Sequence, residues 1–143
     1  MQEIHILLVD DNEGDILLTK EALEEAKIVN RISVAYDGVQ ALNFLKKEPP
    51  FLHEESPDLI LLDINLPRMD GTELLSIIKR DPELRRIPVI MLTTSSSERD
   101  ILISYDNHAN CYITKPVDLE RFMDVVRTIE DFWISIVKLP KTA

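Results

Sequence analysis

The chain has 143 residues, 45% of them apolar and 29% charged, with a formal net charge of −10. This length and composition predict one globular domain with a real core and exclude extensive disorder. The acidic balance argues against a surface for DNA, RNA or anionic membranes, because binding to such surfaces needs clustered Lys and Arg.

The cellular setting is indicated by what the sequence lacks. A single cysteine, Cys111, excludes an internal disulfide and a multi-cysteine zinc site. The N-terminus has no basic region followed by a long apolar run, as a signal peptide would, and no segment is apolar enough to span a bilayer. We therefore expect a cytoplasmic protein with no membrane partner.

The first half of the chain alternates apolar runs with segments of helical periodicity. Ile4–Val9 is an apolar run that ends on two acids and predicts a buried strand. A helix over Glu13–Lys27 is expected next, with Asn12 as its N-cap. Arg31–Tyr36 predicts a second strand, and a second helix is expected to begin at Gly38. The proline-rich stretch 48–57 predicts a long loop.

The second half begins with an apolar run that has no polar alternation, Leu59–Asp63, as expected of a strand buried on both faces of a parallel sheet. A helix capped by Asp118 is expected to end the domain, and Phe132 and Trp133 make its far end unusually apolar. Such an end is either buried or an exposed face for self-association or kinase docking. Between them the sequence predicts a helix over Gly71–Arg80, a strand over Pro88–Thr93, a helix over about Glu98–Asp106 and a strand over Cys111–Thr114.

This alternation of strand and helix, repeated five times, predicts an α/β fold. We expect a doubly wound five-stranded parallel sheet with helices on both faces, built from residues 1–143 as a single domain with its core at about 3–136 and a short C-terminal tail.

Polar side chains stand where four of the predicted strands end. They are Asp10 with Asp11, Asp63, Thr93 and Lys115. The carboxyl ends of parallel strands share one edge of the sheet, so these groups are expected to converge. Clustered carboxylates raise each other's pKa, and a hard divalent cation such as Mg²⁺ relieves that repulsion. A lysine and a hydroxyl facing the cation would complete a site for a phosphoryl group.

Four motifs in this order resemble the receiver domain of two-component response regulators, the CheY-like family, over nearly the whole chain. The motifs are Val9-Asp10-Asp11, Leu62-Asp63 with Pro67 and Met69-Asp70-Gly71, Met91-Leu92-Thr93, and Tyr112-Ile113-Thr114-Lys115-Pro116. The resemblance implies the strand order 2-1-3-4-5. It implies that Asp63 is the phosphoacceptor. It also implies a site for Mg²⁺, or Mn²⁺ in its place, made by Asp10, Asp11, Asp63 and the backbone carbonyl of Asn65.

The same resemblance implies roles for the remaining site residues. Thr93 would bind the phosphoryl oxygens in the active state, with position favouring it over Thr94, and Lys115 would pair with the phosphoryl charge. The rotamer of Tyr112 would follow Thr93. Asn65 and Ser95 would tune how fast water attacks the acyl phosphate. The bond between Lys115 and Pro116 would be cis.

A narrower resemblance is to the single-domain regulators that serve phytochrome-type histidine kinases. It is carried by Ile87-Pro88, Leu92-Thr93-Thr94-Ser95, the segment from Asn110 to Pro116, Phe132-Trp133 and Leu139-Pro140. It implies a phosphoacceptor in a Mg²⁺-dependent phosphorelay, with a sensor histidine kinase as donor. Because the chain ends soon after the last predicted helix, we expect the downstream target to be another protein.

Two other functions are weighed against this one. A metal-dependent phosphatase that forms an aspartyl phosphate would need a second acid two residues after the first, and Asn65 occupies that position and cannot exchange a proton usefully. The protein is therefore not expected to be an enzyme, beyond taking part in its own phosphotransfer and dephosphorylation. A phosphate-independent docking module remains the alternative, although the complete set of acids, threonine and lysine argues against it.

Overall fold

The computed structural model describes residues 4–25, 29–94, 111–125 and 127. Its strands and helices alternate along the chain as the sequence predicts. The strands are β1 Ile4–Val9, β2 Val29–Ala35, β3 Leu59–Asp63, β4 Val89–Thr93 and β5 Cys111–Thr114. The helices are α1 Glu13–Glu24, α2 Gly38–Leu45 and α3 Gly71–Arg80, and residues 119–125 are also helical.

The five strands form one sheet in the order β2-β1-β3-β4-β5, and every neighbouring pair is parallel. The predicted fold class and strand order are therefore confirmed. All residues of β1, β3 and β4 are buried, which explains why their sequences show no polar alternation.

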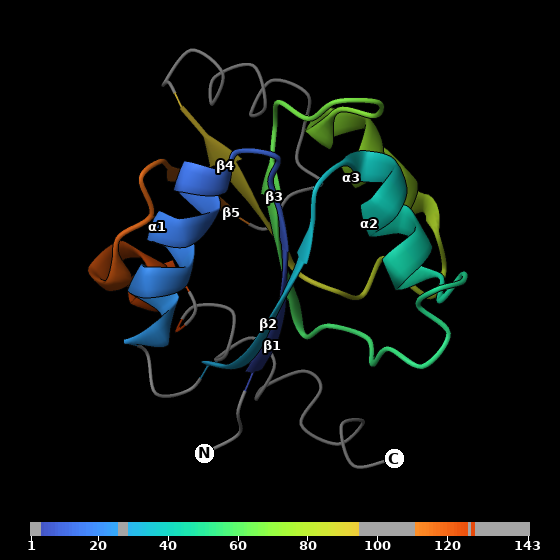
Figure 1. The fold of residues 1–143 in the computed structure, drawn as a ribbon, viewed down its shortest axis with the longest axis horizontal. Helices are drawn as coiled ribbons and strands as arrows, with labels where there is room; N and C mark the ends of the chain where they lie inside the picture. Colours follow the sequence, from blue (N-terminus) through green and yellow to red (C-terminus); the bar gives the residue numbers. More distant parts are fainter. Residues whose placement is uncertain (1–3, 26–28, 95–110, 126, 128–143) are drawn as a thin grey trace.

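Helices cover both faces of this sheet, as Figure 1 shows. On one face α1 and residues 119–125 pack with the side chains of Ile6, Leu8 and Leu61, and Phe122 is completely buried there. On the other face α2 and α3 pack with side chains such as Leu7. Because successive strand residues point to opposite faces, each central strand contributes to both cores. The sheet is thus a buried middle layer between two apolar cores.

Side-chain caps begin the helices close to the strand ends. The predicted caps are confirmed: Asn12 Oδ1 accepts the amide of Asp15 at 2.9 Å, and Asp118 Oδ1 accepts that of Arg121 at 2.8 Å. Two further caps, Asp37 and Asp70, begin α2 and α3 in the same way. Each cap satisfies a backbone donor that the first helical turn leaves free.

A few element boundaries differ from the prediction. Helix α1 ends at Glu24, ahead of Lys27, and β2 is displaced by one or two residues toward the N-terminus. Leu17 and its neighbour Leu18 are 57% and 50% exposed, so the buried stripe of α1 is Ile16, Thr19 and Leu23. The helix predicted at about 98–106 lies outside the described residues.

Within the described ranges, no helix combines the length and the apolar character that crossing a membrane requires.

Candidate functional site

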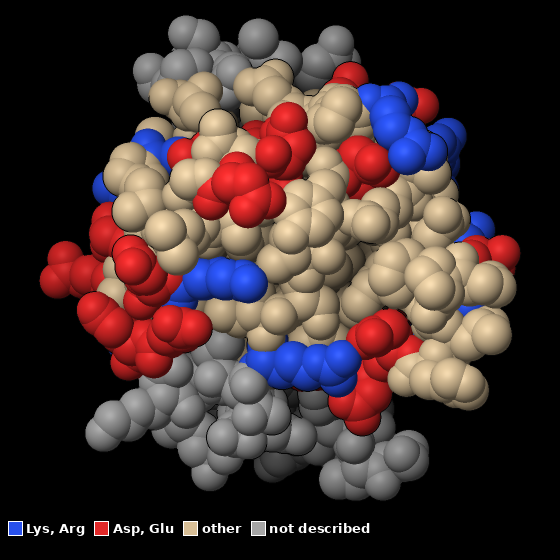
Figure 2. Space-filling view, in the orientation of Figure 1, with Lys and Arg blue, Asp and Glu red and all other residues tan. Residues whose placement is uncertain are grey.

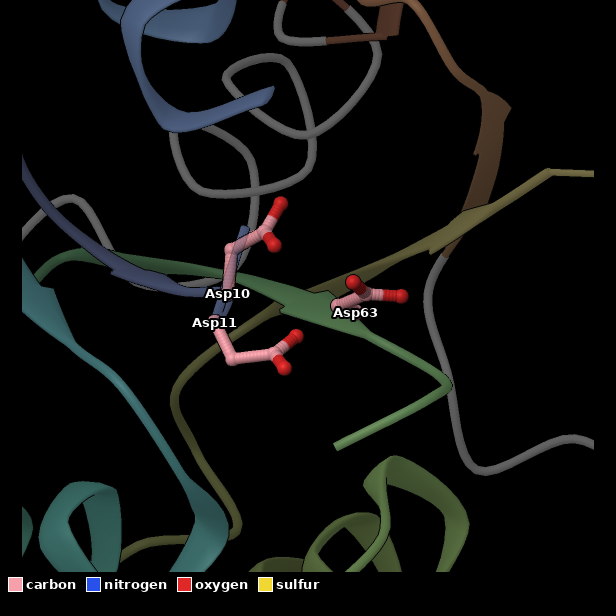
Figure 3. A group of neighbouring side chains, drawn as sticks. All are labelled: Asp10, Asp11 and Asp63. Atoms are coloured by element: carbon pink, nitrogen blue, oxygen red, sulfur yellow. The ribbon is translucent and has the colours of Figure 1, made fainter. Parts of the chain in front are cut away.

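Three carboxylates gather where β1 and β3 end side by side. Asp10 and Asp11 directly follow β1, and Asp63 is the last residue of β3 (Figure 3). One oxygen from each side chain lies within 4.8 Å of the others. Asp10 is completely buried, Asp63 is 4% exposed, and Asp11 is exposed. The sheet thus fixes two of the acids in a low-dielectric setting while the third faces solvent.

Lys115 reaches this cluster from the end of β5. Its Nζ lies 2.8 Å from Asp63 Oδ2 and 2.9 Å from Asp10 Oδ2, and its side chain is only 8% exposed. The backbone amide of Lys115 donates to the carbonyl of Thr93 at 2.8 Å, which fixes the lysine beside the end of β4. The bond from Lys115 to Pro116 is cis, as the family resemblance implies.

The charges of the cluster shift one another's protonation. Burial raises the pKa of Asp63, and the negative charge of Asp10 adds to that rise, while hydrogen bonds from Lys115 and the Asn65 amide oppose it. Burial by itself lowers the pKa of the Lys115 ammonium. Its hydrogen bonds to Asp63 and Asp15, with the nearby charge of Asp10, outweigh that effect and raise the pKa of Lys115 above its ordinary value. The lysine is therefore a permanent cation at neutral pH.

The donor set fits a hard divalent cation. Asp10 Oδ1 accepts the amide of Asn12 at 3.0 Å, whereas the buried Oδ2 lies at ion-pair distance from Lys115 but has no partner with hydrogen-bond geometry within the described residues. Buried carboxylate oxygens are normally hydrogen-bonded. An oxygen left in this state, beside the carboxylates of Asp11 and Asp63, is suited to coordinate Mg²⁺ or Mn²⁺, which prefer oxygen ligands.

The turn after β3 is folded tightly against the phosphoacceptor candidate. The amide of Gly71 donates to the carbonyl of Ile64 at 2.9 Å. A Cβ added to Gly71 would lie 2.2 Å from the carbonyl oxygen of Asp63, so only glycine fits here. Asn65 lies in this turn, is exposed, and donates its amide to Asp63 Oδ1 at 3.2 Å. The turn therefore holds Asn65 directly beside the carboxylate cluster.

Thr93 and Tyr112 occupy the neighbouring strands. Thr93 is completely buried as the last residue of β4, and it pairs in register with Thr114 of β5. Tyr112 is partly buried and packs on the face that α2 and α3 cover. The structure thus brings Asp10, Asp11, Asp63, Asn65, Thr93 and Lys115 to one sheet edge, with Tyr112 nearby. Ser95, Phe132 and Trp133 lie outside the described residues.

Sequence reasoning missed one member of the cluster. Asp15, in the first turn of α1, places Oδ2 2.9 Å from Lys115 Nζ. An acid in the first turn of a helix that begins immediately after Asp10 and Asp11 must lie near the same edge, and that signal was available in the sequence. Acids are also common in first helical turns because they interact favourably with the helix dipole, so the sequence alone does not distinguish the two roles of Asp15.

Most of the chain matches a known family of proteins. The sequence model of the response regulator receiver domain matches residues 6–127. The response regulator Rcp1 of Synechocystis sp. is 44% identical over 135 residues, which are 94% of this chain and 92% of Rcp1.

Solved structures with the same fold include close relatives. A phosphorylated cyanobacterial phytochrome response regulator, RcpA, is 46% identical with a TM-score of 0.76, over 96% of this chain and 99% of that one. The Mn²⁺-bound form of Rcp1 is 43% identical with a TM-score of 0.73, over 96% and 99%. The bacteriophytochrome response regulator RtBRR is 41% identical with a TM-score of 0.82, over 88% and 77%.

Proposed function

Since this chain belongs to the response regulator receiver domain family, we propose that it accepts a phosphoryl group on Asp63 from a sensor histidine kinase. The observation that carries the proposal is the contact of a buried Asp63 with the Lys115 ammonium at 2.8 Å, beside two further carboxylates. The residues that we propose as nucleophile, counter-cation and metal ligands all lie at one edge of the sheet.

The proposed step is a displacement at phosphorus. A carboxylate oxygen of Asp63 forms a P–O bond as the bond from phosphorus to the donor breaks, and the donor leaves with that electron pair. Lys115 remains within reach to pair with a phosphoryl oxygen, because its stem is buried and its backbone is tied to Thr93. The hydroxyl of Thr93 would bind another phosphoryl oxygen. Fixed charges of this kind stabilise the transition state because they need no reorganisation.

A Mg²⁺ ion would be held by Asp10, Asp11, Asp63 and the backbone carbonyl of Asn65. When bound, it supplies positive charge that neutralises the phosphoryl oxygens. The Mn²⁺-bound form of Rcp1 supports this assignment, since that protein is 43% identical over nearly the full length of both chains.

The proposed readout is a population shift. A phosphoryl oxygen bound to the Thr93 hydroxyl would favour one rotamer of Tyr112. That rotamer would shift the populations of the conformations available to the sheet face that α2 and α3 cover. Asn65 and Ser95 would set the rate at which water hydrolyses the acyl phosphate.

We propose that residues 1–143 act as a single-domain cytoplasmic regulator. We also propose that it forms a homodimer through the end of the chain that contains Phe132 and Trp133.

The partner we propose is a phytochrome-type histidine kinase. Support comes from two solved relatives, RcpA and RtBRR, which are a phytochrome and a bacteriophytochrome response regulator and are 46% and 41% identical to this chain. Phosphotransfer from a purified phytochrome-type kinase should be at least about tenfold faster than from an unrelated histidine kinase, which corresponds to a specificity of about 1.4 kcal/mol. Equal rates would contradict this pairing and leave the phosphoacceptor proposal intact.

The phosphoacceptor is tested by intact mass spectrometry after brief incubation with acetyl phosphate and Mg²⁺. We expect one phosphoryl group on the wild-type protein, and none on Asp63→Asn or in EDTA. Asp118→Asn is the matched control, since it removes a carboxylate outside the cluster and keeps a capping side chain. An adduct on Asp63→Asn would overturn the assignment, and no adduct on any sample would favour a phosphate-independent docking module.

A further inference from the structure

Lys115 has a partner that the proposed phosphotransfer does not use. Its Nζ contacts Asp10, Asp63 and Asp15, at 2.9, 2.8 and 2.9 Å. The first two acids belong to the proposed metal site. Asp15 comes from α1, and its side chain is 36% exposed, in contrast to the buried pair. The ammonium thus bridges the interior of the site to the start of a surface helix.

The lysine and a divalent cation would share two carboxylates. Lys115 contacts Oδ2 of both Asp10 and Asp63, and these two carboxylates also belong to the group that can hold a metal. Two cations that share the same carboxylates weaken each other's binding, because each neutralises the charge that attracts the other. A second anion that pairs with the ammonium therefore favours metal binding, because it draws the competing charge away from the shared carboxylates.

Asp15 is placed to be that anion. Its carboxylate lies outside the group formed by Asp10, Asp11 and Asp63, so a metal there leaves it unoccupied. Its amide is held by the Asn12 cap at 2.9 Å, which fixes the first turn of α1 beside the cluster. Lys115 can therefore keep its contact with Asp15 when it gives up its contacts with Asp10 and Asp63.

We infer that Asp15 is a positioning residue that holds the Lys115 ammonium when a divalent cation occupies Asp10 and Asp63. The inference rests on the proposed function, because it assumes that the acidic cluster is a metal site. It assigns Asp15 an effect on metal affinity that operates through Lys115 and does not require direct coordination.

A double-mutant cycle on metal binding tests the inference. Mn²⁺ affinity is measured from the electron paramagnetic resonance signal of the free ion, so no phosphoryl donor is needed. We expect Asp15→Asn to weaken binding roughly three- to fivefold, the upper range for an ion pair with an exposed partner. In a Lys115→Gln background the same change should have an effect below about twofold, because no ammonium remains to be held.

Two controls separate this role from general electrostatics and from folding. Glu13→Gln removes an equal charge from the same first turn of α1. Glu13 is exposed and, within the described residues, forms no ion pair with Lys115, so this change should leave the affinity within about twofold. Asp15→Glu should restore most of the wild-type affinity. The amide exchange of α1 should be similar in all variants.

The outcomes distinguish the two proposals. An equal loss of affinity in both backgrounds, or no loss in Asp15→Asn, would overturn the inference alone. Wild-type protein that binds no Mn²⁺ would overturn the inference and the proposed metal site together. Phosphorylation of Asp63 by acetyl phosphate is measured separately, and its failure with normal Mn²⁺ binding would count against the proposed function only.

Discussion

At the scale of single residues, the ionisation of Asp63 is set by the opposing effects of its burial and of the charged residues around it. Asp63 is buried beside Asp10, and both conditions disfavour its ionised form. Lys115 supplies the opposing charge from a different strand. Ionisation of Asp63 therefore costs more in the folded protein than in the unfolded chain, and shifted pKa values of this kind are common in functional carboxylates.

This cost gives a prediction for the pH dependence of stability. Because the pKa of Asp63 is raised in the folded state, its contribution to stability is complete below the ordinary value of 3.8 and is lost as pH rises through the folded value. Asn at position 63 does not titrate. The unfolding free energy of Asp63→Asn minus that of the wild type should therefore increase as pH rises from about 4 toward 7, measured by urea denaturation in EDTA.

Asp70→Asn is the comparison that should behave in the opposite way. Hydrogen bonds from the Glu73 amide and the Thr72 hydroxyl lower the pKa of Asp70, so its contribution is present above 3.8 and lost as pH falls through the folded value. The unfolding free energy of Asp70→Asn minus that of the wild type should therefore decrease as pH rises. The effect is small because Asp70 is exposed. A pH-independent difference for Asp63→Asn would contradict the argument.

At the scale of elements, short connections from strand ends to helix caps give the site its shape. The turn from β3 to α3 is so tight that Gly71 touches the backbone of Asp63 and Ile64. The cap Asp70 then begins α3 within the same turn. The position of the Asp63 carboxylate is thus set by backbone packing as well as by the sheet.

Gly71→Ala should therefore disturb both folding and the site. The new methyl group would meet the Asp63 carbonyl oxygen at 2.2 Å, and backbone atoms cannot move aside cheaply. We expect a loss of about 1–3 kcal/mol in unfolding free energy, the usual cost of overpacking, together with weaker Mn²⁺ binding. Chemical denaturation and metal titration on the same samples measure the two effects.

Gly14→Ala is the matched control within a helix. Its added Cβ would lie 3.3 Å from Asn12 Oδ1 and meets no backbone atom. Alanine favours the helix by up to about 1 kcal/mol, so this variant should be neutral or stabilised. If both substitutions cost the same, the close approach of Gly71 to Asp63 would not be the cause.

At the scale of the whole molecule, the layers of the fold could be predicted from the sequence, whereas the local contacts between them could not. Uninterrupted apolar strands and short helices define a parallel α/β sheet, and polar strand ends then have to converge at one edge. The exposure of Leu17 could not be read from periodicity, because adjacent helical residues can both be buried, as Leu74 and Leu75 of α3 are, and the sequence does not say whether Leu17 follows Ile16 into the core. The contact of Asp15 with Lys115 joins residues 100 positions apart and depends on how α1 lies against β5.

The same convergence makes the stability of the whole fold depend on divalent ions. In the folded state Asp10, Asp11 and Asp63 lie together, whereas an unfolded chain separates them, so a metal binds the folded state preferentially. Mg²⁺ at about 100 times its dissociation constant should raise the unfolding free energy by about 2.7 kcal/mol.

Asp11→Asn should lose most of this gain in unfolding free energy. Its stability in EDTA should change little, because Asp11 is exposed and the fold does not depend on its contacts. Thermal unfolding at matched ionic strength, with Na⁺ in place of Mg²⁺, separates site binding from general screening of the net charge of −10. Equal stabilisation by Na⁺, or by Mg²⁺ in wild type and Asp11→Asn, would mean that the acidic cluster has no specific affinity for the ion.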